Sequence, residues 1–389
     1  MKQHLIDPEI CIRCYTCEEM CPAGAITHDH LNVVVDNDKC DNCMNCIAPC
    51  PTGSIDIWQL VDQPYTLAEQ LGWEELPEAS APDKCSTHIE ALDDPIDALL
   101  AKAHAGNSGK PVAAASASKA SINHYTSLAP VKALVQGSYR LTAEGEDEVR
   151  HIVLSLQGAP FQYLEGQNIG IIATGKNQQG QPHQARLYSV SSPRDGERPN
   201  TNNMSLTVKR EAQGICSNYL CDLQKGDLID VVGPYGTTFL MPEHPSAKLM
   251  MICTGTGSAP FRAFTMRRQR TQPNAQDSMF LYFGARTPES LPYFGPLGKV
   301  PGSFLQKHFA FSRMADKPKQ YVQDLLLDNS VQVGQQLRDP NMHIFMCGLK
   351  GMESGVNEAF ESISRKIGIN WSETREQMRC EGRYHVETY

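Results

Sequence analysis

No apolar run in the sequence approaches the ~18 residues that would predict a membrane-spanning helix. The opening stretch, MKQHLIDPEI, has no charged-then-apolar pattern of a secretion signal. Basic residues form no stripe, so nucleic-acid binding is not expected. The twelve histidines form no H-x-x-x-H or H-E-x-x-H pair, which argues against a mononuclear metal site. These absences predict a soluble protein of the reducing cytoplasm, without membrane or nucleic-acid partners.

Acidic charge is concentrated at the N-terminus of the chain, whose 389 residues suffice for two to four domains. The whole chain carries a net charge of −9, and residues 1–60 hold nine acidic against three basic residues, so −6 of it lies there. Most acidic residues of this kind are expected to lie on the solvated surface, where they keep the protein in solution. The alternative is an acidic docking face for a basic redox partner.

Eight of the fourteen cysteines lie within the first 50 residues, in two copies of the pattern C-x-x-C-x-x-C-x-x-x-C-P. The first copy comprises Cys11, Cys14, Cys17 and Cys21, and the second Cys40, Cys43, Cys46 and Cys50. This run holds two [4Fe–4S] clusters in bacterial-type ferredoxins, where the fourth cysteine of each copy binds the other cluster. Cys50 is therefore expected to complete the first cluster and Cys21 the second. Zinc knuckles or a disulfide scaffold would not explain the proline after each fourth cysteine.

Changes in amino-acid composition and in the spacing of apolar residues divide the chain into four predicted segments. A two-[4Fe–4S] ferredoxin domain (1–62) is followed by a connecting segment and linker (63–130), a flavin-binding β-barrel (131–245) and a nucleotide-binding domain (246–389). Within the connection, a helix is expected to begin at Pro95, and the Ala-, Ser- and Gly-rich stretch from 105 to 130 is expected to be flexible. Alternating apolar runs predict an antiparallel barrel, and alternating strands and helices predict a doubly wound parallel sheet. The fold class is α+β and α/β multidomain.

Two stretches of the barrel segment predict a flavin dinucleotide site. They are Arg186-Leu187-Tyr188-Ser189 and the run that contains Gly214, Cys216, Ser217 and Asn218. FAD needs a cation and helix N-terminal amides for its pyrophosphate, an aromatic face for its ring and a hydrogen bond near N5. Arg186 and the second stretch meet the first need, Tyr188 the second and Ser189 the third.

The last segment opens with a strand that runs into a glycine-containing turn and a helix. The expected cofactor-binding residues there are Thr254, Gly255, Thr256, Gly257, Pro260 and Arg262. Glycines at such a turn let the backbone approach a pyrophosphate, and the helix N-terminus attracts its charge.

From about residue 130 to 389 the chain resembles plant-type ferredoxin–NADP⁺ reductases. The resemblance is carried by RLYSVSSP, GICSNYLCDL, CTGTGSAPFR, FMCGLKGME and the terminal VETY. It implies FAD in the barrel and NADP(H) in the doubly wound domain. It further implies that Cys347 lies beside the nicotinamide with Gly348 and Leu349, that Glu387 handles a proton, and that Tyr389 covers the flavin.

The same resemblance implies a site for the 2′-phosphate and adenine of NADPH after the strand HFAF. Its expected members are Ser312, Arg313, Lys319, Tyr321 and Gln323. A guanidinium can bind a phosphate through two charge-assisted hydrogen bonds, and a tyrosine can stack on adenine. NADPH is therefore expected in preference to NADH.

The whole chain, with a two-cluster ferredoxin ahead of the reductase, resembles the reductase components of benzoyl-CoA 2,3-epoxidase systems. This implies transfer of electrons from NADPH through FAD and the clusters to a separate di-iron oxygenase. Alternatives are a reductase that serves another acceptor and a non-catalytic electron carrier. The sequence leaves the oligomeric state open, with a homodimer as one alternative. The remaining cysteines Cys85, Cys221, Cys253 and Cys380 are expected to be packed thiols.

Overall fold

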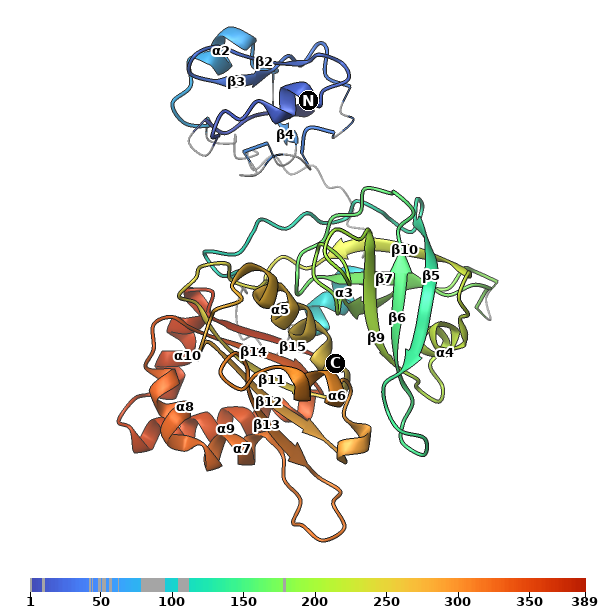
Figure 1. Ribbon diagram of the computed structural model, residues 1–389, viewed down its shortest axis with the longest axis vertical. Helices are drawn as coiled ribbons and strands as arrows, with labels where there is room; N and C mark the ends of the chain where they lie inside the picture. The colour runs from blue at the N-terminus through green and yellow to red at the C-terminus, as the bar shows by residue number, and fades with distance from the viewer. Residues whose placement is uncertain are drawn as a thin grey trace. The chain divides into compact units, whose positions relative to one another are not determined.

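The computed structural model describes residues 2–8, 11–41, 43, 45–47, 50, 54–55, 58–61, 63–77, 95–103, 112–177 and 180–389 (Figure 1). The chain forms two compact units, residues 1–91 and residues 92–389. None of the helices in these described ranges combines the length and the apolar composition that crossing a bilayer requires.

The N-terminal unit is built from short elements around a small apolar core. Its strands pair in two antiparallel sheets: β1 (Lys2–His4) with β4 (Trp58–Leu60), and β2 (Ile26–His28) with β3 (Val33–Val35). Its helices are α1 (Thr16–Glu19) and α2 (Leu67–Leu71). The core comprises Ile6, Cys17, Ile26, Val33, Val35, Cys46 and Ile55. So small a core stabilises little by itself, which is typical of domains that depend on a bound metal centre.

Helix α2 extends this unit past residue 62, where the sequence placed the end of the ferredoxin domain. The helix begins with a capping box, in which Thr66 Oγ accepts from Glu69 N–H at 3.3 Å and Glu69 Oε2 accepts from Thr66 N–H at 2.7 Å. Gln70 is buried and forms two hydrogen bonds with the backbone of Val35, at 3.1 and 2.9 Å. The segment that follows β4 is thus attached to the sheet of the cluster unit.

The C-terminal unit begins with α3 (Pro95–Ala103), a helix that starts at the predicted proline. Residues 112–130 then lie against the barrel, which contradicts the prediction of a flexible linker for this stretch. Ser116 Oγ accepts from His244 N–H at 3.3 Å, and Ser118 Oγ accepts from Arg194 Nη1 at 3.1 Å. The segment has too few apolar side chains for a core of its own, and its polar groups are satisfied by the barrel instead.

The barrel has the predicted antiparallel topology. Its strands are β5 (Val131–Arg140), β6 (Val149–Ser155), β7 (Asn168–Ile172), β8 (Arg186–Ser189), β9 (Asn203–Lys209) and β10 (Leu228–Tyr235). They are hydrogen-bonded in the order β8-β7-β10-β5-β6-β9, and a bridge between Val190 and Leu206 connects the two edges. Alternate side chains of β5 and β6 point into an apolar interior. Helix α4 (Ile215–Asp222) packs against β9.

The last domain is the predicted doubly wound sheet. Its parallel strands are β11 (Lys248–Thr254), β12 (Met279–Ala285), β13 (Gln306–Phe311), β14 (Met342–Gly348) and β15 (Tyr384–Thr388). Helices α5 (Ser258–Thr271) and α6 (Phe294–Lys299) cover one face; α7 (Val322–Asp328), α8 (Ser330–Leu337), α9 (Lys350–Lys366) and α10 (Trp371–Cys380) cover the other (Figure 1). The order β13-β12-β11-β14-β15 reverses between β11 and β14, where ligands of open α/β sheets bind.

Candidate active site

A cleft of about 550 Å³ lies between the barrel and the doubly wound domain. Four predicted stretches, far apart in the sequence, meet in its lining. The predicted residues among its lining are Arg186, Leu187, Tyr188, Ser189, Gly214, Cys216, Ser217, Thr256, Glu387 and Tyr389. The fold therefore brings the expected flavin residues together with the C-terminus of the chain.

One part of the cleft is suited to a phosphate group. The guanidinium of Arg186 is exposed and forms no ion pair among the residues the structure describes. Gly214 precedes the first turn of α4, whose N-terminal amides carry partial positive charge. The side chain of Asn218, by contrast, donates to the carbonyls of Gly214 at 2.8 Å and Glu211 at 2.9 Å. Asn218 thus holds the turn, and its side chain is not part of the cleft lining.

Two tyrosines supply aromatic surface in the same cleft. Tyr188 lies against the buried Cys216. The pKa of its phenol is raised, mainly by burial and to a smaller extent by the neighbouring Cys216. Tyr389 is 55% exposed, and its hydroxyl lies 2.6 Å from Thr256 Oγ. A flat aromatic cofactor fits a cleft with such walls, because stacking contributes attraction beyond the apolar area that is buried.

A hydrogen-bonded chain of three side chains lies beside these rings. Ser189 Oγ donates to Asn168 Oδ1 at 2.9 Å, and Asn168 Nδ2 donates to Glu387 Oε1 at 2.9 Å. Ser189 Oγ also lies 3.5 Å from that carboxylate oxygen. Sequence analysis missed Asn168, although a polar residue at the start of the apolar strand NIGII was an available signal. Its position follows from the register of β7 and β8, which pairs Asn168 with Ser189.

Cys347 ends up next to Glu387 because β14 and β15 pair these two residues. Its thiol is 1% exposed, and burial, followed by the charge of Glu387, raises its pKa well above the usual value. Cys347 is therefore a neutral thiol at physiological pH. A sulfhydryl is a small, polarizable and weakly donating group that can pack against a ligand ring.

Glycine is required where the turn after β11 meets the end of β14. A Cβ on Gly257 would lie 2.1 Å from the carbonyl oxygen of Cys347. Gly348 has φ +145°, and a Cβ there would lie 2.5 Å from Thr254 Oγ. The same Thr254 Oγ accepts from the N–H of Leu349 at 3.2 Å, and Pro260 is buried in the first turn of α5. Gly255, Thr256 and Gly257 form a short 3-10 turn at this edge.

Arg262, predicted to bind the nucleotide, has a different environment. Its Nη1 donates to Ser191 O at 2.7 Å, and its two terminal nitrogens each donate to the carboxylate of Glu197 at 2.8 Å. Tyr293 lies below the guanidinium, with its ring centroid 5.1 Å from Arg262 Cζ. The side chain therefore joins α5 to the barrel, so the expectation of direct nucleotide binding is not supported. A motif locates a residue but does not orient its side chain.

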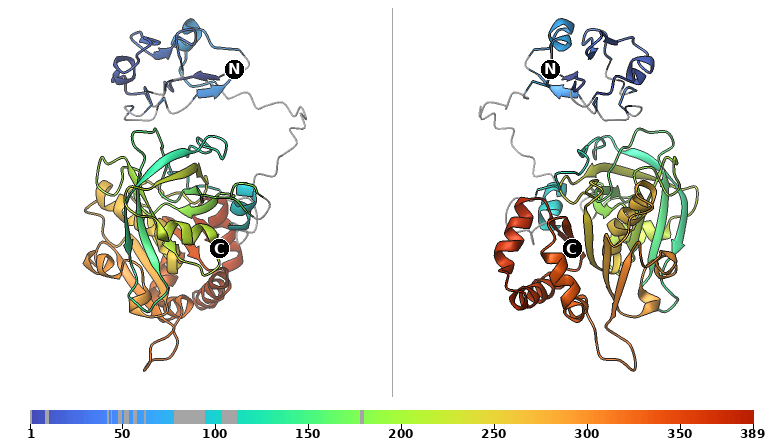
Figure 2. Two further views of the ribbon diagram at one scale, coloured as in Figure 1. Left: turned by 90° about the vertical axis from the view of Figure 1, so that its right-hand side faces the viewer. Right: turned by 60° about the vertical axis from the view of Figure 1, so that its left-hand side comes forward.

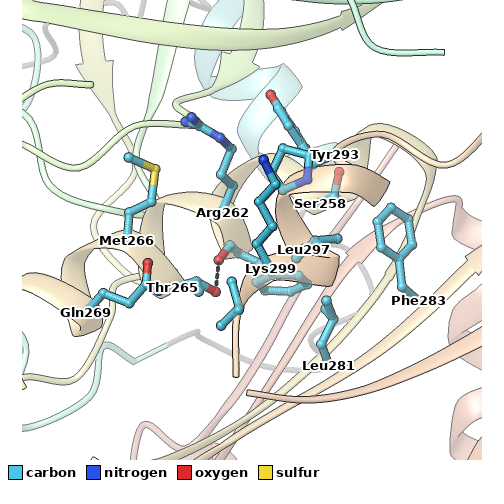
Figure 3. A pocket seen from close by; sticks show the side chains of 13 residues that line it. Ser258, Arg262, Thr265, Met266, Gln269, Leu281, Phe283, Tyr293, Leu297 and Lys299 are labelled. Atoms are coloured by element: carbon cyan, nitrogen blue, oxygen red, sulfur yellow. Dashed lines mark hydrogen bonds between the residues drawn. The ribbon is translucent and has the colours of Figure 1, made fainter. Parts of the chain in front are cut away.

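A second cavity of about 310 Å³ lies between α5 and α6 (Figure 3). Phe261, Leu281, Phe283 and Leu297 give it a mainly apolar lining. In Figure 3 the guanidinium of Arg262 points away from Leu281 and Phe283. Among the described residues that line this cavity, none carries a thiol or a carboxylate. None of them lines the 550 Å³ cleft, hereafter the flavin cleft because it contains the residues predicted to bind flavin.

The residues expected around a 2′-phosphate lie at the carboxyl end of β13, on the same sheet edge as the glycine turn. Arg313 and Lys319 are exposed and form no ion pair within the described ranges. Arg313 N–H donates to Arg286 O at 2.8 Å, and Ser312 N–H to Ala285 O at 3.1 Å. Tyr321, 46% exposed, precedes α7, and Gln323 packs against Gly355 of α9. The cationic groups of Arg313 and Lys319 and the ring of Tyr321 are thus all accessible to solvent.

The eight N-terminal cysteines are free thiols. Six of them lie in or against the core of the first unit, and Cys14 and Cys43 are exposed. Cys17 and Cys46 are buried, and burial raises the pKa of each to about 11. At Cys17 the nearby Cys50 also raises the pKa. No three ligand-type side chains in the described ranges converge on one ion, but in a cubane each thiolate binds a different iron. The donor set therefore fits two clusters.

Of the other cysteines, Cys221 and Cys253 are buried, as predicted. Cys380 is exposed at the end of α10, so the prediction of a packed thiol there is wrong. Cys85 lies outside the described residues.

Three family descriptions match consecutive parts of the chain. Residues 3–52 match the 4Fe-4S dicluster domain, residues 145–239 the oxidoreductase FAD-binding domain, and residues 251–358 the oxidoreductase NAD-binding domain. The chain therefore carries the domains for two [4Fe–4S] clusters, FAD and a nicotinamide nucleotide.

Known proteins share this likeness over 63–69% of the chain. The ferredoxin–NADP reductase of Synechocystis sp. is 36% identical over 69% of this chain and 70% of its own length. That of Spirulina sp. is 35% identical over 63% of this chain and 90% of its own. The solved reductase of Plasmodium falciparum has 25% identity and a TM-score of 0.55 over 69% of this chain and 99% of its own. A mutant of it, at 26% identity and a TM-score of 0.55 over the same shares, was solved in complex with 2'P-AMP.

The family matches, the observed fold of the two domains and the cleft between these domains all indicate the same family. The chain belongs to the ferredoxin–NADP reductase family, as an NADP-dependent FAD oxidoreductase with an N-terminal 4Fe-4S dicluster domain.

Proposed function

We propose that this reductase passes electrons from NADPH through FAD and its own two clusters to a separate oxygenase, the di-iron benzoyl-CoA 2,3-epoxidase. The observation that carries the proposal is the presence of a dicluster domain and an FAD- and NADP-binding unit in one chain. Bound FAD accepts two electrons together and releases them singly, which one-electron clusters require. The choice of oxygenase rests on the resemblance of the whole chain to the reductase components of those systems.

Tyr389 would regulate access of the nicotinamide to the flavin. Its hydroxyl bonds to Thr256 at 2.6 Å, and its backbone N–H donates to Gly348 O at 3.0 Å. The ring lines the cleft and lies just outside β15, which ends at Thr388, so it can swing aside without moving a strand. An aromatic cover of this kind keeps the apolar face of the cleft from water until the nicotinamide replaces it.

Ser189, Asn168 and Glu387 would position and move a proton at the reacting edge. Asn168 holds the carboxylate of Glu387 through a hydrogen bond of 2.9 Å. Ser189 and Glu387 both line the cleft, and Ser189 Oγ lies 3.5 Å from the carboxylate, so its hydroxyl can relay a proton. The neutral thiol of Cys347 would pack against the nicotinamide and align it for hydride transfer.

The exposed cations Arg313 and Lys319 would select NADPH. Only NADPH carries a 2′-phosphate, and a guanidinium can bind it through two charge-assisted hydrogen bonds. Tyr321 is exposed beside them and would stack on the adenine. The complex of a related reductase with 2'P-AMP supports recognition of the same chemical group here.

The clusters would be the exit for electrons. The test is a Cys14→Ser variant, because this thiol belongs to the first cluster and is exposed. We expect normal reduction of ferricyanide by NADPH and loss of electron delivery to the oxygenase. Cys380 is also exposed but lies outside both cysteine patterns, so Cys380→Ser is the matched control and should behave as wild type. Oxygenase turnover that survives loss of the cluster would show that electrons leave from the flavin, and the proposed route would be wrong.

A second acceptor class follows from the relatives, which are named for ferredoxin. The acidic N-terminal segment, −6 over residues 1–60, favours a basic partner surface in either case. Steady-state assays with the purified oxygenase and with ferredoxins, across a range of salt, distinguish the acceptors. Genes for a di-iron oxygenase and a CoA ligase beside this one would favour the epoxidase.

A further inference from the structure

Helix α3 belongs to the flavin cleft, although it lies outside every stretch that matches a cofactor-binding family. Leu99, Leu100 and Ala103 line the same cavity as Arg186 and Tyr188. The matched FAD-binding domain begins only at residue 145, and the matched dicluster domain ends at residue 52. In Figures 1 and 2 the helix lies beside the barrel strands, in contact with β8 and β15.

The helix is attached by an apolar face. Ile96 is 4% exposed and packs in a cluster with Ala185, Val232 and Tyr235 of the barrel. Leu100 joins the edge of that cluster with Leu187 of β8. Lys102, on the same helix, is exposed. This division of apolar and charged side chains is that of a helix docked by one face.

Docking also accounts for the helix itself. α3 has nine residues, and isolated helices shorter than ~12 residues are marginal in water. Its helical state therefore depends on the barrel surface beside the flavin cleft. A ligand that fills the cleft and contacts α3 would stabilise the docked helix, and the docked helix would in turn favour the ligand.

We propose that α3 is a wall of the flavin site. Leu99, Leu100 and Ala103 would contact the apolar part of the flavin ring, while Arg186 serves the pyrophosphate and Ser189 the polar edge of the ring.

The test uses the full-length, FAD-loaded protein with Leu99→Asp and Leu100→Asp combined. Two measurements concern the flavin site: the FAD dissociation constant and quenching of flavin fluorescence by iodide. We expect FAD to bind about tenfold more weakly, equivalent to about 1.4 kcal/mol, and iodide to quench more strongly.

Lys102→Ala is the matched control on the exposed side of the same helix and should leave both measurements unchanged. If the double variant folds poorly, Leu100→Ala provides the same test with a smaller expected effect. Unchanged FAD affinity and quenching would refute α3 as a wall of the site.

Discussion

Replacing Glu197 by Gln should destabilise the C-terminal unit, because this carboxylate is the acceptor at the junction of the barrel and the doubly wound domain. It receives two hydrogen bonds of 2.8 Å from Arg262 of α5. His151 Nε2 lies 3.3 Å away on the barrel side, and its ring bonds in turn to Tyr293 at 2.9 Å. Burial alone would raise the pKa of Glu197, but His151 and Arg262 outweigh it and lower the pKa. The group is therefore charged throughout the physiological range.

The magnitude follows from the burial of the pair. The Arg262 and Glu197 side chains are 21% and 17% exposed. Breaking a buried pair typically costs 3–5 kcal/mol and an exposed one below about 1 kcal/mol, so about 2–4 kcal/mol is expected here. Glutamine keeps an acceptor oxygen but loses the charge, which leaves the guanidinium of Arg262 with the Ser191 carbonyl as its main acceptor. For a unit of this size about 2 °C is lost per kcal/mol, which gives about 4–8 °C.

Scanning calorimetry of the FAD-loaded protein measures this change as a shift of the C-terminal unit's transition. The matched control is Glu361→Gln, which breaks an exposed i,i+4 pair with Arg365 at 3.6 Å. It should shift the transition by less than about 1 °C, since such pairs contribute about 0.3–0.5 kcal/mol. Combining Glu197→Leu with Arg262→Met should recover much of the loss, because replacing both partners leaves no unpaired charge. Equal shifts for Glu197→Gln and Glu361→Gln would refute a stabilising role of this junction.

Three further predictions concern the site and the sheet. Cys347→Ser should retain FAD but slow hydride transfer at least tenfold, about 1.4 kcal/mol, in single-turnover kinetics; normal transfer with lowered stability would make it a packing residue only. Arg313→Ala should raise KM for NADPH and leave that for NADH nearly unchanged, and equal losses would contradict the phosphate site. The pKa of His343 is lowered to about 4 from a usual 6.5, mainly by burial and next by the charge of Arg383. The unfolded protein therefore binds a proton that the folded protein does not, and the stability of the fold decreases as the pH drops from about 6.5 to 4. In urea titrations, His343→Asn should reduce the acid-induced loss of stability by up to about 3 kcal/mol. If wild type and variant lose stability in parallel as the pH drops, His343 does not cause the loss.

Features that depend on local spacing were predictable from the sequence. The eight cluster cysteines follow from a pattern in which ligands a few residues apart wrap one cluster, so no knowledge of distant contacts is needed. The alternation of apolar residues likewise indicated the barrel strands, and the strand–helix alternation indicated the doubly wound sheet, because each reflects the period of one element. Motifs such as Arg186-Leu187-Tyr188-Ser189 located the lining of the cleft for the same reason.

Contacts between distant elements were decided by the tertiary structure. Asn168 joins Glu387 across 219 positions, and Arg262 turns to Glu197 instead of the glycine turn that it follows. The stretch after residue 112 is polar enough to suggest a flexible linker, yet the barrel supplies its hydrogen-bond partners. Ile96 gives no local sign that its helix docks beside the flavin cleft. Periodicity reports which face of an element is apolar, whereas the surface that covers this face depends on long-range packing of the whole chain.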